Sequence, residues 1–161
     1  MPSPRRTGRH SERPWELRPD EVPAGPLVLD TDAFTFVSDR SSVGDPFRSL
    51  VAGHELLLTF VTVGEALQGA LSRGWGHEKM NALESRLRSY GVIGGSIDAA
   101  RRYAELARTL RDQVPYNDLW IAACALGQEP PLPLLSNDKH MQTIAGVSDL
   151  VIVRPDLQPS A

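Results

Sequence analysis

The apolar residues of this chain gather in short, continuous runs. They occupy positions 27–29, 54–60, 92–93, 132–135 and 150–153. Runs this short and this uniformly apolar are typical of strands buried on both faces of a parallel sheet. The sequence therefore predicts four or five strands, the first of which, Leu27-Val28-Leu29, is followed at once by Asp30 and Asp32.

Between these runs the apolar residues recur with helical spacing. Helices are predicted over residues 33–38, 45–52, 62–73, 77–90, 96–112, 118–126 and 138–144. Asp45, Thr62, Ser96 and Asn117 are the expected N-caps, and Thr62 with Glu65 forms a capping-box pattern. Strands that alternate with helices indicate an α/β fold with a mainly parallel sheet.

Composition divides the chain into three parts. Residues 1–25 are rich in Pro, Arg, Ser and Glu and are predicted to form a disordered N-terminal arm. Residues 26–155 are predicted to form the folded domain, and 156–161 a C-terminal tail. The one cysteine, Cys124, favours a reducing cytoplasm, and no apolar run approaches the length of a membrane span. The net charge of −3 lacks the basic excess of many nucleic-acid binders, but net charge alone decides little.

Four acids share one kind of position, because each lies where an apolar run gives way to a helix or within a helix's first turn. They are Asp30, Glu65, Asp118 and Asp138. Strand ends and helix starts lie along the same edge of a parallel sheet, so these four carboxylates are candidates to converge.

Each acid taken alone has a structural explanation. Glu65 completes a capping box, and Asp118 and Asp138 complement a helix dipole, worth about 0.3–1 kcal/mol each. Four acids on one edge would repel one another without a cation, and oxygen ligands favour Mg²⁺ or Mn²⁺. The four histidines show no metal-ligand spacing, so we expect them on the surface or supporting a ligand; they are His10, His54, His77 and His140.

Four segments resemble the acidic motifs of PIN domains, in particular VapC-type toxins of bacterial toxin–antitoxin pairs: LVLDTDAF, TVGEALQGA, NDLWIAACAL and LLSNDKHMQTIAGV. The resemblance implies a three-layer α/β/α fold and a catalytic, metal-binding site formed by Asp30, Glu65, Asp118 and Asp138. Ser136 takes the place of a Thr or Ser near the metal. The long arm, Asp32 and Met141 depart from the family pattern.

The resemblance also implies an activity and partners. The activity is Mg²⁺-dependent endoribonuclease cleavage, with Mn²⁺ as an alternative ion and one or two ions polarising the phosphate and activating water. The partners are an RNA substrate, a VapB-type antitoxin that places an Arg-type side chain near the carboxylates, and a second copy of the chain.

Two other functions fit parts of the sequence. Asp30-Thr31-Asp32 after an aliphatic strand is similar to the first motif of haloacid-dehalogenase-like phosphatases, in which Asp30 would be the nucleophile and Asp32 the acid/base. Phe34 stands where that motif usually has Thr or Val. The other alternative is a PIN-like binding module whose acids no longer cleave RNA.

Overall fold

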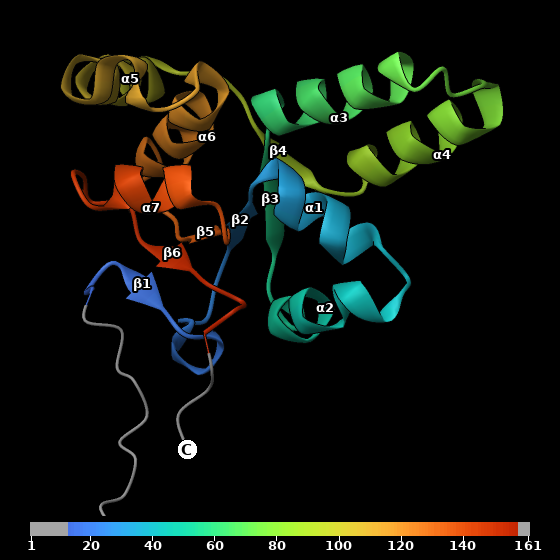
Figure 1. The fold of residues 1–161 in the computed structure, drawn as a ribbon, viewed down its shortest axis with the longest axis horizontal. Helices are drawn as coiled ribbons and strands as arrows, with labels where there is room; N and C mark the ends of the chain where they lie inside the picture. The colour runs from blue at the N-terminus through green and yellow to red at the C-terminus, as the bar shows by residue number, and fades with distance from the viewer. Residues whose placement is uncertain (1–12, 158–161) are drawn as a thin grey trace, which may run out of the picture.

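A six-stranded sheet, entirely parallel, organises the chain (Figure 1). The computed structural model describes residues 13–157. The strand order is β1-β6-β5-β2-β3-β4. The strands are β1 (Glu16–Leu17), β2 (Leu27–Leu29), β3 (Leu56–Thr59), β4 (Gly91–Ile93), β5 (Leu134–Leu135) and β6 (Ile152–Val153).

Within residues 13–157, seven α-helices cover the two faces of this sheet. They are α1 (Thr31–Ser38), α2 (Asp45–Val51), α3 (Phe60–Ser72), α4 (His77–Arg88), α5 (Ile97–Leu110), α6 (Tyr116–Leu126) and α7 (Lys139–Ala145). In Figure 1, α5, α6 and α7 lie on one side of the strands and α1 to α4 on the other. This confirms the three-layer α/β/α architecture. Within residues 13–157 no helix is long and apolar enough to cross a membrane.

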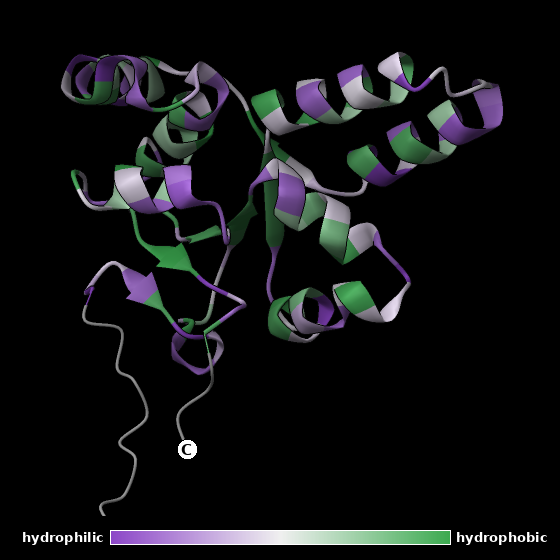
Figure 2. Ribbon diagram, viewed as in Figure 1, coloured by the Kyte–Doolittle hydropathy of each residue, from purple (hydrophilic) through white to green (hydrophobic). Residues whose placement is uncertain are grey.

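Alternation along the strands builds a separate core on each face. Val28 and Leu134 pack into the cluster that includes α5, α6 and α7, whereas Leu27, Leu29 and Leu135 pack into the cluster that includes α1, α2 and α4. All five side chains are completely buried. β2 and β5 are therefore apolar on both faces, as their continuous apolar runs in the sequence predict. Figure 2 shows the apolar character of the central strands.

The sheet has one more strand than the sequence predicts. The extra strand is β1, which pairs with β6 and lies inside the segment predicted to be a disordered arm. Its backbone is held by Ile152, whose N–H donates to the Trp15 carbonyl, and its Glu16 carboxylate accepts a hydrogen bond from Arg154 Nη1 at 3.1 Å. The arm prediction is thus wrong for residues 16–17. β1 contains a buried glutamate that pairs with a distant arginine, so it lacks an apolar run from which a strand could be predicted. The first twelve residues of that arm lie outside the described part of the chain.

Three of the four predicted N-caps are displaced. Thr59 rather than Thr62 caps α3, and its side chain accepts a hydrogen bond from the Thr62 N–H. The N-cap position of α2 is Gly44 rather than Asp45, and that of α6 is Pro115 rather than Asn117. Ser96 caps α5 as predicted, accepting from the Ala99 N–H at 3.0 Å. The displacement in α3 moves Glu65 out of the first turn, so its side chain has no capping role there.

Candidate functional site

The strand order places a switch point between β2 and β5. From β2 the chain proceeds to β3 and β4 on one side, then returns to β5 on the other side of β2. Crevices of this kind, beyond the carboxyl ends of parallel strands, are where open α/β sheets bind ligands. Asp30 follows β2, and Ser136 and Asp138 follow β5, so these residues lie at the crevice.

Asp30 is the most buried acid of the group, with 4% of its surface exposed. Leu29 is in register with Leu135, which brings the next residues, Asp30 and Ser136, side by side. Asp30 Oδ1 accepts the Ala33 N–H at 2.7 Å and so caps α1, while the Ser136 side chain also hydrogen-bonds to the Asp30 carboxyl. Burial is the largest influence on Asp30 and raises its pKa to about 7.

Glu65 is brought to the same edge by a contact between α1 and α3. Thr31 Oγ1 donates a hydrogen bond of 2.7 Å to Glu65 Oε1. Thr31 directly follows Asp30, so this bond connects the Glu65 carboxylate to the first turn after β2. The bond orients Glu65 and leaves its other oxygen available to a ligand.

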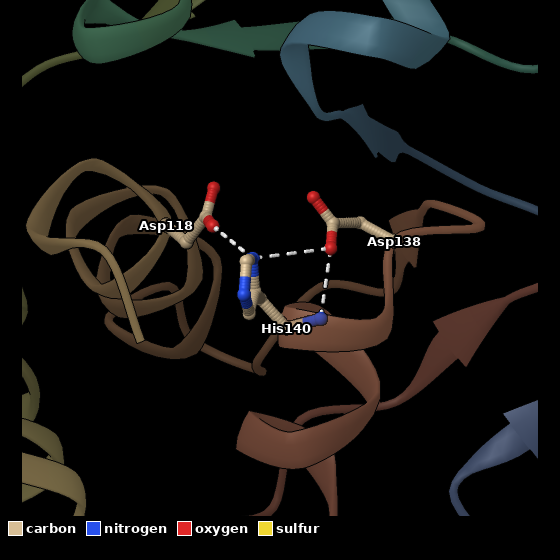
Figure 3. Close-up of side chains that lie close together, drawn as sticks. All are labelled: Asp118, Asp138 and His140. Carbon is tan, nitrogen blue, oxygen red and sulfur yellow. Dashed lines mark hydrogen bonds and ion pairs between the residues drawn. The ribbon is translucent and has the colours of Figure 1, made fainter. Parts of the chain in front are cut away.

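Asp118, in the first turn of α6, and Asp138, the N-cap of α7, face each other across an imidazole (Figure 3). His140 Nδ1 lies 3.3 Å from Asp118 Oδ2 and 3.4 Å from Asp138 Oδ1. Asp138 Oδ1 also accepts the backbone N–H of His140 at 2.8 Å. Figure 3 shows the second oxygen of each carboxylate directed away from the ring.

The acids act on one another electrostatically. Burial is the largest influence on Asp118 and, together with the charge of Asp138, raises its pKa to about 6. Glu65 and Asp32 raise this pKa further by smaller amounts, whereas His140 lowers it. Burial and the charges of Asp138 and Glu65 likewise raise the pKa of Asp32. The acids predicted at this edge are therefore close enough to disfavour one another's ionised forms.

His140 is the residue that sequence reasoning missed. All four acids predicted from the sequence lie at this edge, but His140 lies between two of them. Its only signal was its position two residues after Asp138, within the first turn of a helix that starts at the crevice. Asp32, in the first turn of α1, is more exposed than these acids, although its carboxyl is partly desolvated.

The donors fit a hard divalent cation. Carboxylates dominate the group, their mutual repulsion would be relieved by positive charge, and the Asp118, Asp138 and His140 donor atoms all lie within 4.8 Å of one another. Among the described residues, Asp118, Asp138 and His140 are the side chains whose donor atoms lie close enough together to hold such an ion, and Asp30 and Glu65 lie at the same edge of the sheet.

The contact between Thr31 and Glu65 can be tested without touching an acid. Thr31→Val keeps the shape of the side chain and removes the donor to Glu65, so we expect the affinity for a divalent ion to fall about tenfold, as for other residues that orient metal ligands. Thr35→Val is the matched control, since its hydroxyl donates only to the Thr31 carbonyl on an exposed face. Equal effects of the two variants would contradict an orienting role for Thr31.

The fold and the acidic edge define an α/β protein with a candidate metal centre at the switch point of its sheet. The family model of the PIN domain matches residues 27–147. The chain thus belongs to the PIN domain family. None of the curated proteins compared with it matches.

Solved structures agree with this assignment. VapBC-1 from nontypeable Haemophilus influenzae superposes with a TM-score of 0.65 at 24% identity, over 81% of this chain and 98% of that one. VapBC-5 from Mycobacterium tuberculosis, of the VapBC family of toxin–antitoxin systems, gives 0.59 at 27% identity, over 82% and 99%. A DNA-bound VapBC from Salmonella typhimurium gives 0.66 at 18% identity, over 81% and 98%. The chain shares its fold with these proteins.

Proposed function

We propose that this protein is a VapC-type toxin, an endoribonuclease that hydrolyses RNA phosphodiester bonds with a divalent ion, Mg²⁺ or Mn²⁺. The observation that carries the proposal is the gathering of Asp30, Glu65, Asp118 and Asp138, from four distant segments, at the switch point of a PIN fold. Carboxylates that repel one another are stabilised by a bound cation. A cation at this position would in turn attract an anionic substrate such as a phosphodiester.

The protein's own residues have separable tasks in this proposal. Asp30, Glu65, Asp118 and Asp138 would hold the ion. Ser136 and the Ala33 N–H fix the Asp30 carboxylate, and Thr31 fixes Glu65. When bound, a divalent ion polarises the phosphate and makes a coordinated water more acidic. Asp30 must lose its proton to bind the ion, which its pKa of about 7 permits at cytoplasmic pH.

The direct test is ribonuclease activity of the purified protein with and without Mg²⁺ or Mn²⁺, followed by sequencing of the RNA ends. Cleavage that requires the ion and is lost in Asp30→Asn supports the proposal. If both proteins cleave equally, or neither cleaves any RNA tried, the nuclease function is wrong. In the latter case a PIN-like binding module, whose acids do not cleave, becomes the better description.

Asp32→Ala separates a nuclease from a phosphatase that uses Asp30 and Asp32. Because Asp32 is more exposed than the four acids, we expect the variant to retain RNA cleavage within about tenfold of the wild type. Neither protein should hydrolyse p-nitrophenyl phosphate. Phosphatase activity in the wild type that Asp32→Ala abolishes would favour the haloacid-dehalogenase-like alternative, which the PIN family match disfavours.

An antitoxin and a second copy of the chain are proposed as partners. VapBC-5 belongs by name to a family of toxin–antitoxin systems. In this chain an apolar groove of about 330 Å³ opens between α3, α4 and β4, and it is lined by Val63, Leu67, Leu87 and Val92 with Glu84 and Arg88. Copurification with the product of a small neighbouring gene would support the antitoxin. A strictly monomeric protein in sedimentation that binds no such product would count against both partners.

A further inference from the structure

The imidazole of His140 stands between two acids of the proposed site. Its Nδ1 is 3.3 Å from Asp118 Oδ2 and 3.4 Å from Asp138 Oδ1. Two-thirds of the His140 side chain is covered, since 33% is exposed. Figure 3 shows this nitrogen directed at the space between the two carboxylates.

Helix capping does not require this side chain. Asp138 caps α7 through the backbone N–H of His140, which any residue but proline would supply equally. An ion pair that is partly exposed to solvent contributes little stability, about 0–1 kcal/mol. The position of the imidazole therefore has a weak structural explanation.

The spacing of the three donor atoms matches that of ligands around one ion. Octahedral ligands at about 2.1 Å from an ion lie roughly 3 Å from one another, close to the two distances from Nδ1. All three donor atoms lie within 4.8 Å of one another. One neutral nitrogen beside carboxylate oxygens also changes which ion is preferred, because Mg²⁺ binds oxygen almost exclusively, whereas imidazole suits the first-row transition metals.

We propose that His140 is a ligand of the divalent ion, together with Asp118 and Asp138, and that it shifts the site's preference from Mg²⁺ toward Mn²⁺. This inference rests on the proposed function for the existence of an ion at this edge. It adds a residue outside the set of four acids and a consequence for ion choice.

The test measures binding rather than cleavage. Mn²⁺ affinity is measured by electron paramagnetic resonance and Mg²⁺ affinity by calorimetry, for the wild type, His140→Ala and His77→Ala. His77 lies exposed at the start of α4 and serves as the control. His140→Ala should weaken Mn²⁺ binding at least about tenfold and Mg²⁺ binding less than about threefold. His77→Ala should change neither. Pulsed spectra of the Mn²⁺-loaded wild type should show coupling to a bound nitrogen, which His140→Ala abolishes.

The outcomes separate this inference from the proposed function. Absence of nitrogen coupling in the wild type, or equal losses of Mn²⁺ and Mg²⁺ affinity in His140→Ala, overturns the ligand role and leaves the nuclease proposal intact. A wild type that binds neither ion overturns both. Nitrogen coupling in a protein that cleaves no RNA keeps the ligand role and refutes the nuclease.

Discussion

Asp30→Asn is expected to abolish RNA cleavage and at the same time to make the metal-free protein more stable. Asparagine keeps the oxygen that accepts the Ala33 N–H, so the cap of α1 survives. It removes the charge that would hold the ion, and we expect at least about a thousandfold loss of activity. It also removes the free-energy cost of an ionised carboxylate buried to 4% exposure, so the melting temperature at pH 8 should rise.

The matched control is Asp39→Asn. Asp39 is exposed, and the Ser41 N–H that it accepts lowers its pKa, the opposite of Asp30. This variant should keep full activity and gain no stability. A fall in stability of Asp30→Asn at pH 8 would show that the Asp30 charge is compensated within the metal-free protein, which would contradict the need for a cation.

The stability difference between Asp30→Asn and the metal-free wild type is expected to grow as pH rises from 5 to 8. The Asp30 carboxyl binds its proton more tightly in the folded protein, with a pKa of about 7 against 3.8 unfolded. The folded state therefore holds more protons over this interval, and wild-type stability is lost as pH rises toward 7. Between pH 5 and 8 the difference amounts to roughly 3 kcal/mol, or roughly 5–10 °C in melting temperature.

Added Mn²⁺ or Mg²⁺ should reduce the stability difference between Asp30→Asn and the wild type at pH 8, because the ion stabilises the wild type. The ion should have little effect at pH 5, where protons compete with it for the carboxyls. Thermal melts of both proteins at the two pH values, with ion and with chelator, measure all four cases. Equal protection by the ion at pH 5 and pH 8 would mean that it binds away from Asp30.

The sheet was predictable wherever a strand is buried on both faces. Leu27, Val28 and Leu29 point alternately into two apolar cores, so all three residues are apolar. Such a strand can be predicted from its own residues, without knowing which strands lie beside it. β1 was not predictable, because its buried Glu16 pairs with Arg13 and with Arg154, which lies 138 positions away. The residues next to Glu16 in the sequence do not indicate a contact with a residue so far along the chain.

The site was predictable to the extent that acids mark the ends of strands and the starts of helices. Asp30 and Asp138 follow that rule directly, as N-caps at the carboxyl edge. Glu65 lies at the site for a different reason than its capping-box pattern suggested. Its carboxylate is held by the hydrogen bond from Thr31 and does not cap the start of its own helix. His140 could not be assigned, since a histidine becomes part of a site only when folding sets α6 beside α7.

The order in which the side chains appear along the chain has a consequence for synthesis of the protein. Asp30 is made early, but Asp138 and His140 come from α7, and β5 is held in the sheet by β6 as well as by β2. A growing polypeptide on the ribosome therefore cannot complete the acidic edge until α7 has been translated. Any activity that needs all four acids would be absent from chains that stop before α7.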